Sequence, residues 1–148
     1  MESDTFRWDT ARAMSKENVE AVRQTRVAFN SGDPDLVAAL LARDAEIVPM
    51  RAAIEGTSYR GPDAAQRFFA DLNETWQEIK MEELETRDLG DRVFATGLVR
   101  GRGQRSGIQV VVEMKMAWVV DFQGGLITRF VTYTGDRAEA LEAAGLAE

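Results

Sequence analysis

Two long strand-like runs decide the fold of this chain: Gly107-Ile-Gln-Val-Val-Val-Glu-Met-Lys-Met-Ala-Trp-Val-Val-Asp-Phe122 and Leu126-Ile-Thr-Arg-Phe-Val-Thr-Tyr-Thr134. Both are rich in β-branched and aromatic residues, and only Gln123-Gly124-Gly125 separates them. Glycine-containing links of this length typically join the strands of a β-hairpin. We therefore expect an antiparallel pair in the middle or at the back of a curved sheet, with one face lining a pocket.

Side-chain alternation predicts the character of each hairpin face. A three-residue loop with Gly125 in a bulge places Trp118 opposite Phe130 and Met116 opposite Thr132. A two-residue loop, which we favour less, puts Lys115 beside Thr132. With the first register, the charges share one face, so we expect the other face to be buried. The buried set is Met114, Met116, Trp118, Val120, Thr128, Phe130 and Thr132, and the outward, half-polar set is Glu113, Lys115, Ala117, Val119, Ile127, Arg129, Val131 and Tyr133.

Length and composition narrow the function classes. The 148 residues suffice for one domain with a real core. A net charge of −7 disfavours a partner such as nucleic acid or an anionic membrane surface. The chain has neither cysteine nor histidine, which excludes disulfides, thiol nucleophiles and Ser-His-Asp machinery. We expect no metal and no cofactor, and we expect a cytoplasmic protein because no secretion signal or membrane span is visible.

The helices precede most of the strands. Residues 1–13 lack a clear period and are expected to form a poorly ordered arm before a single domain, residues 14–148. Ser15 is a plausible N-cap for a first helix with Val19, Val22 and Phe29 inward. Asp33 caps a second helix from Pro34 to about residue 42, and Pro62 begins a third that runs to about Trp76.

The remaining segments are predicted as strands and one last helix. This arrangement indicates an α+β fold with a largely antiparallel sheet. The expected strands are Ala45–Met50, Glu78–Leu89 and Arg92–Arg102, with Gly101–Gly107 as a connection, and the last helix is Arg137–Ala144, ended by Gly145.

Six short pieces in this order carry a family resemblance. They are Glu17-Asn-Val-Glu20, Phe29-Asn-Ser-Gly-Asp33, Asp44-Ala-Glu-Ile47, Tyr59-Arg-Gly61, Gly90-Asp-Arg-Val93 and Gly124-Gly-Leu-Ile-Thr-Arg129. Together they resemble the nuclear transport factor 2-like superfamily and its SnoaL-like branch. The resemblance implies a cone-shaped fold, in which a curved mixed or antiparallel sheet wraps around three N-terminal helices, with a short C-terminal helix. It also implies frequent homodimers that pack sheet to sheet.

The residues that carry chemistry in relatives are replaced here. In the resemblance, Thr25 stands where steroid isomerases have an oxyanion-binding tyrosine, and Pro49 stands where they have a base carboxylate. Thr132 and Phe130 stand where SnoaL-like cyclases have an acid and a histidine. Each replacement removes a proton-transfer group.

The candidate ligand-binding residues come from the first helix, the pocket rim and the hairpin. Arg26 either clamps an anion in the pocket or lies at the edge of its helix face. Tyr59 either donates a hydrogen bond to a ligand or packs under its loop. The aromatic residues and Met116 either line a pocket or form ordinary core. The set is Thr25, Arg26, Phe29, Tyr59, Trp76, Met116, Trp118, Phe130 and Thr132.

Two functional hypotheses follow. The first is a protein that binds a small hydrophobic molecule in an apolar pocket, without an acid/base catalytic set, and forms a homodimer. The alternative is an enzyme of the isomerase, cyclase or hydrolase kind, acting on a polyketide- or steroid-like substrate. Such an enzyme needs a buried carboxylate or a tyrosine–arginine pair in the pocket. Since we expect no Asp or Glu side chain there, the sequence favours binding.

Overall fold

The computed structural model describes residues 2–49, 58–134 and 137–146. The predicted succession of helices and strands is confirmed, with one short strand, β2, added. The elements are α1 (Glu2–Ser31), α2 (Pro34–Leu40), β1 (Leu41–Val48), β2 (Tyr59–Arg60), α4 (Ala64–Thr75), β3 (Glu78–Asp88), β4 (Arg92–Arg105), β5 (Ile108–Gln123), β6 (Leu126–Thr134) and α5 (Arg137–Ala143). Local signals act as expected, since the Asp33 carboxylate accepts a hydrogen bond from the Leu36 N–H at the start of α2.

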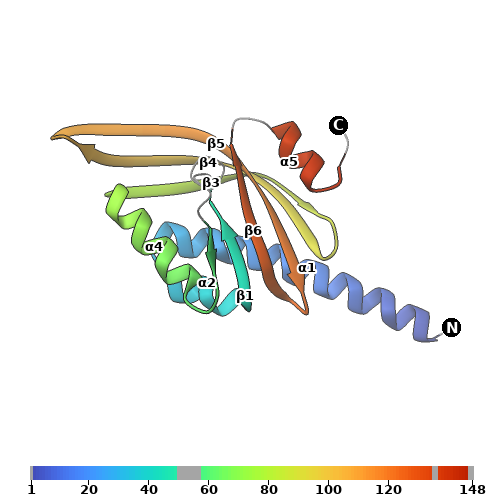
Figure 1. The fold of residues 1–148 in the computed structure, drawn as a ribbon. Coiled ribbons are helices and arrows are strands. Elements are labelled where there is room, and N and C mark those ends of the chain that lie inside the picture. The colour runs from blue at the N-terminus through green and yellow to red at the C-terminus, as the bar shows by residue number, and fades with distance from the viewer. Residues whose placement is uncertain (1, 50–57, 135–136, 147–148) are drawn as a thin grey trace.

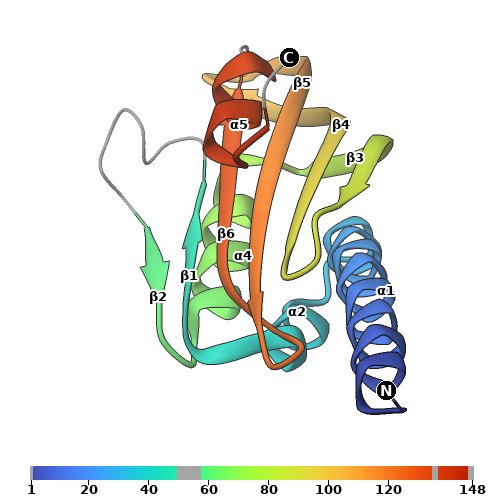
Figure 2. The ribbon, with the colours of Figure 1, turned by 90° about the vertical axis from the view of Figure 1, so that its right-hand side faces the viewer.

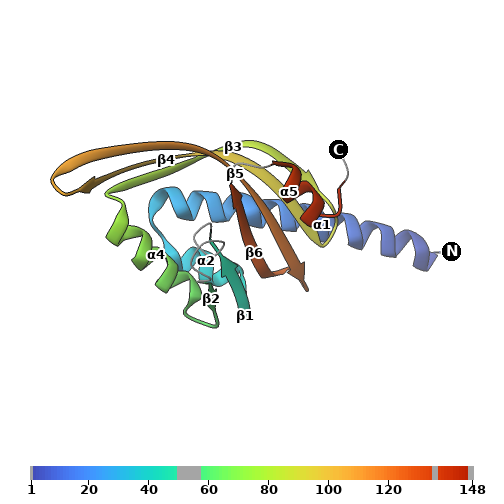
Figure 3. The ribbon, with the colours of Figure 1, turned by 45° about the horizontal axis from the view of Figure 1, so that its top comes forward.

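The strands form one bent, six-stranded sheet in the order β2-β1-β6-β5-β4-β3 (Figure 2). β1 and β6 run parallel, whereas the other described pairs are antiparallel, so the sheet is mixed. Helices α1, α2 and α4 cover the concave face, and α5 lies on the opposite face (Figures 1 and 3). This is the α+β architecture expected from the sequence. None of the described helices has the length and apolarity that a bilayer crossing requires.

The register of the β5–β6 hairpin differs from the predicted one. Gln123 pairs with Leu126 across a two-residue turn, and Trp118 pairs with Thr132 rather than Phe130. Gly124 and Gly125 both have positive φ, 60° and 81°, and this turn type matches the twist of the flanking strands. A bulge at Thr128 then adds one residue to β6.

The turn and the bulge together move the pairing by two residues, so almost every side chain keeps its predicted face. One exception is Thr128, which was expected on the buried face and is instead the extra residue of the bulge, and the other is Ile127, which lies between the turn and the bulge. It was expected to face outward, but it is fully buried among the concave-face residues Val120 and Phe122.

Two further boundaries were predicted wrongly. α1 begins at Glu2 rather than at Ser15, because no glycine or proline between them ends the helix. The Ser15 hydroxyl is therefore no N-cap and instead donates to the Asp88 carboxylate. Gly101 and Gly103 lie inside β4 rather than in a connection, and the turn to β5 falls at Ser106 and Gly107.

The core has a large part on the concave face and a smaller part on the convex face. On the concave face, Ala21 and Val22 of α1 pack against Val93, Trp118 and Val120. On the convex face, α5 covers part of the outward, half-polar set of hairpin residues. The buried residues of this convex cluster are Phe94, Ala117, Val119, Ala140, Leu141 and Ala144.

Candidate functional site

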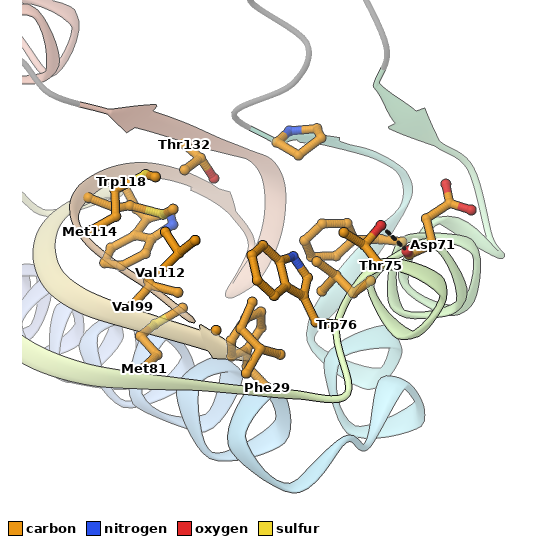
Figure 4. A pocket seen from close by; sticks show the side chains of 16 residues that line it. Phe29, Asp71, Thr75, Trp76, Met81, Val99, Val112, Met114, Trp118 and Thr132 are labelled. Atoms are coloured by element: carbon orange, nitrogen blue, oxygen red, sulfur yellow. Dashed lines mark hydrogen bonds between the residues drawn. The ribbon is translucent and has the colours of Figure 1, made fainter. Parts of the chain in front are cut away.

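An apolar cavity of about 240 Å³ lies between the helices and the concave face of the sheet (Figure 4). Strand alternation builds one wall, since every second residue of β5 from Val112 to Trp118 points into it. α4 supplies the facing wall. The lining residues are Phe29, Pro49, Phe68, Asp71, Leu72, Thr75, Trp76, Ile79, Met81, Val99, Gly101, Val112, Met114, Met116, Trp118 and Thr132.

Glycines in β4 make room for the two large rings of this cavity. A Cβ on Gly97 would lie 2.9 Å from Cζ3 of Trp118, and one on Gly101 would lie 2.8 Å from Cε3 of Trp76. Real Cβ atoms do not make contacts this short, so a larger residue at Gly101 would displace the Trp76 indole. A larger residue at Gly97 would meet both Trp118 and, at 2.6 Å, the backbone oxygen of Glu82. Gly101, expected in a connection, thus lies inside β4 beneath Trp76, and Gly97 of the same strand lies beneath Trp118.

The structure brings five of the predicted site residues to this cavity. They come from α1, the end of α4, and the hairpin, as expected, and they are Phe29, Trp76, Met116, Trp118 and Thr132. Thr25 and Phe130 line an adjoining hollow of about 60 Å³ that shares Phe29, Trp118 and Thr132 with the cavity. The Thr25 hydroxyl donates to the Val22 carbonyl oxygen at 2.6 Å, within its own helix.

Arg26 is not brought to the main cavity. Its guanidinium lies 3.0 Å from the carboxylate of Glu83 on β3. Hydrogen bonds from Thr86 and from Arg26 hold the pKa of Glu83 below its usual value, despite the opposing effect of burial. The position thus corresponds to the edge of the helix face, one of the two interpretations of the sequence.

Tyr59 supports the cavity wall without lining it. The side chain is buried, its ring centroid lies 5.6 Å from that of Phe68, and its hydroxyl donates to the Asp71 carboxylate. It packs against Ile47, Ala64 and Phe68, and the contact of its hydroxyl is with the Asp71 carboxylate of the protein itself; most of the loop before it lies outside the described residues.

Sequence reasoning missed Asp71, the one ionisable residue among the 16 that line the cavity. The helical spacing of Phe68, Asp71, Leu72 and Thr75 was the available signal, because residues three and four apart share a helix face. The Thr75 hydroxyl donates to the Asp71 carbonyl oxygen at 3.3 Å. Figure 4 shows the Asp71 carboxylate at the edge of the site, turned away from Trp118.

The chemical capacity of the wall is limited. Its polar groups are the Asp71 carboxylate, the hydroxyls of Thr75 and Thr132, and the indole N–H groups of Trp76 and Trp118. Across the described part of the chain, no three His, Cys, Asp or Glu side chains gather as a metal would require. Such a wall suits burial of an apolar molecule with a few hydrogen bonds.

The sequence profile of the SnoaL-like domain matches residues 19–130, which form most of the fold just described. The chain belongs to the SnoaL-like domain family. No curated protein matches this SnoaL-like chain.

Solved structures resemble this SnoaL-like domain over most of their length. An NTF2-like protein of unknown function from Burkholderia pseudomallei K96243 is 22% identical, with a TM-score of 0.71 over 85% of this chain and 95% of that one. A candidate polyketide cyclase from Xanthomonas campestris pv. campestris is 23% identical, with a TM-score of 0.70 over 82% and 93%. A protein with a ketosteroid isomerase-like fold from Catenulispora acidiphila DSM 44928, solved with trimethylamine, is 21% identical, with a TM-score of 0.68 over 86% and 94%. At these identities the likeness concerns the fold.

Proposed function

We propose that this SnoaL-like domain binds a small, largely apolar molecule in the 240 Å³ cavity and that the cavity wall contributes no acid/base pair. One observation carries the proposal: among the 16 lining residues, Asp71 alone is ionisable. Apolar concave sites with a few polar groups are the usual form of small-molecule sites. The name of the relative from Xanthomonas is consistent with a ring-containing organic ligand.

The test uses a neutral fluorescent probe, N-phenyl-1-naphthylamine, titrated into the wild type and into Trp118→Ala. Trp118 is 6% exposed and lines the cavity, so its removal should weaken probe binding at least severalfold. It should also lower the free energy of unfolding by ~3–5 kcal/mol. Val111→Ala is the matched control, since Val111 lies on the same strand and is 72% exposed. Equal probe affinity in wild type and Trp118→Ala would refute the proposal.

A second candidate function, an isomerase-, cyclase- or hydrolase-type enzyme, is favoured by the Asp71–Tyr59 pair alone. A carboxylate beside a hydrophobic cavity is the group that such chemistry needs, and Tyr59 orients it. The test is exchange of the α-protons of 1-tetralone in D₂O, followed by NMR. Exchange that is faster with the wild type than with Asp71→Asn would replace the binding proposal with this one.

We also propose a homodimer through the convex sheet face. The part of the predicted outward face that α5 leaves uncovered includes the exposed charges Lys115, Arg129 and Glu113, the last 2.7 Å from Arg100. Mixed patches of this kind suit an interface between identical subunits, where each charge meets its opposite. Sedimentation of a 16.5 kDa monomer at micromolar concentration would exclude the dimer.

The cytoplasmic location expected from the sequence remains a proposal as well.

A further inference from the structure

The two tryptophans of the cavity are seated in the same way. In both, the benzene edge of the indole lies against a glycine of β4, with Trp118 over Gly97 and Trp76 over Gly101. The atoms nearest the glycines are Cζ3 and Cη2 of Trp118 and Cε3 and Cζ3 of Trp76. The ring nitrogen is attached at the other edge of an indole. In both rings the nitrogen is therefore not among the atoms nearest the glycine, and it lies on the far side of the ring from the contacting benzene edge.

Neither indole N–H has an acceptor among the described residues, although an indole nitrogen only donates and usually finds a partner when buried, as Trp118 is; Trp76 is partly exposed. Trp118 is 6% exposed. Within the described part of the chain, the buried side-chain atom that is both unpaired and sealed from solvent is Asn18 Oδ1. The Trp118 nitrogen is unpaired but not sealed, so it is reached from the cavity. Figure 4 shows it on the side of its ring that faces Trp76.

The charge of the wall sets a second condition. No Lys or Arg is among the lining residues, and Asp71 supplies one negative charge. An anionic ligand would lose its hydration without gaining a cation, at a cost that two neutral N–H donors do not offset. The acceptor that these donors suit is thus an uncharged oxygen, such as a ketone or quinone carbonyl.

We propose that Trp76 and Trp118 determine specificity by donating hydrogen bonds to the ligand, and that the ligand is an uncharged ring compound bearing a carbonyl oxygen. This inference rests on the proposed function and adds its chemical class. The rings provide apolar contact, the N–H groups recognise the oxygen, and the β4 glycines hold both rings in place.

The experiment compares 1-tetralone with tetralin, which has the same ring system without the carbonyl. Dissociation constants are measured by ligand-observed NMR for the wild type, Trp76→Phe, Trp118→Phe and the double variant. Phenylalanine keeps an aromatic ring and removes the N–H. Met114→Leu is the matched control, because Met114 lines the same cavity and has no donor. Thermal unfolding verifies that each variant is folded, and the two single variants provide the result if the double variant is not.

The readout is the ratio of the two dissociation constants, which removes the difference in hydrophobicity between the probes. We expect the preference for 1-tetralone to fall by about threefold to tenfold in either Phe variant and to be unchanged in Met114→Leu. An unchanged ratio in both Phe variants overturns the inference, as does binding of 1-naphthoate as tight as that of 1-tetralone. If tetralin and 1-tetralone both fail to bind the wild type, the proposed function fails instead.

Discussion

At the scale of single residues, β4 is unusual because it has glycines on its concave face. Gly97, Gly101 and Gly103 all face the concave side, where strands normally present apolar side chains. Glycine weakens a strand, so its presence here needs a gain elsewhere. That gain is the packing of two indoles directly on the backbone of β4, which opens the cavity beside them.

Gly101→Ala tests this explanation. The new Cβ would lie 2.8–3.1 Å from three Trp76 ring atoms, so the ring must move. We expect a loss of ~1–3 kcal/mol of unfolding free energy and weaker binding of N-phenyl-1-naphthylamine. Adding Trp76→Phe should recover part of the stability, because the colliding benzene ring is gone. Arg100→Ala, an exposed neighbour, serves as the control, and equal stability of Gly101→Ala and wild type in urea would contradict the account.

At the scale of elements, the bulge in β6 is an addition to an otherwise regular ladder. Phe122 pairs with Ile127 and Asp121 with Arg129, so Thr128 has no partner residue of its own. Its hydroxyl donates to the Asp121 carbonyl oxygen at 3.2 Å. Deleting the residue Thr128 would leave the strand pairings on both sides of the bulge unchanged.

We therefore expect deletion of Thr128 to be tolerated, with a cooperative melt and a modest loss of stability. Deletion of Val131 is the matched comparison. It shifts the strand by one residue, which brings Arg129 to the concave face and turns Phe130 outward. The measurements are the thermal melt and the near-ultraviolet circular dichroism of both variants. A Thr128 deletion that unfolds as readily as the Val131 deletion would show that the bulge is required for the fold.

At the scale of the whole molecule, ion pairs link elements that are distant in sequence. Glu46 on β1 lies 3.1 Å from Arg129 on β6 and 3.6 Å from Arg60 on β2, and Glu83 joins β3 to α1 through Arg26. Burial acts to raise the pKa of Glu46, but hydrogen bonds from Arg129 and Ser58 and the charge of Arg60 outweigh it, so the pKa is lowered. The pKa of Glu83 is lowered as well.

This predicts a particular loss of stability in acid. A carboxyl whose pKa is lower in the folded state stabilises the fold fully above its unfolded pKa, near 4.5, and loses that effect as pH falls through the folded pKa. Glu46→Gln/Glu83→Gln should be less stable than wild type at about pH 7 and lose less stability between about pH 5 and pH 3. Glu139→Gln/Glu142→Gln, at two exposed positions of α5, is the control. Urea unfolding at each pH measures the free energy of unfolding. Parallel curves of this free energy against pH for Glu46→Gln/Glu83→Gln and wild type would disprove the prediction.

The amino-terminal part of α1 allows a second prediction at this scale. The first turns of the helix extend beyond the sheet (Figures 1 and 3). A segment with few neighbours contributes little to stability, so truncation to Met14 should cost under about 1 kcal/mol of unfolding free energy. Thermal melting of the truncated and full chains makes the comparison. A larger loss would show that residues 1–13 are docked, for instance across a dimer.

The sequence alone determined the element order, nearly all side-chain faces of the hairpin and five of the 16 residues of the cavity wall. These follow from local rules, because alternation in β5 and the caps at Asp33 and Gly145 depend on near neighbours in the chain. Such rules also located Trp76, Trp118 and Thr132 correctly relative to the concave face.

Only the tertiary structure decided the hairpin register, the partners of Arg26 and Tyr59, and the role of the β4 glycines. Each depends on groups far apart in sequence: Glu83 for Arg26, Asp71 for Tyr59, and Trp76 for Gly101. It also decided that α5, rather than solvent, covers Ala117 and Val119. Local conformational preferences do not predict such contacts, because the free energy of these contacts is gained only when the sheet bends and brings distant segments together.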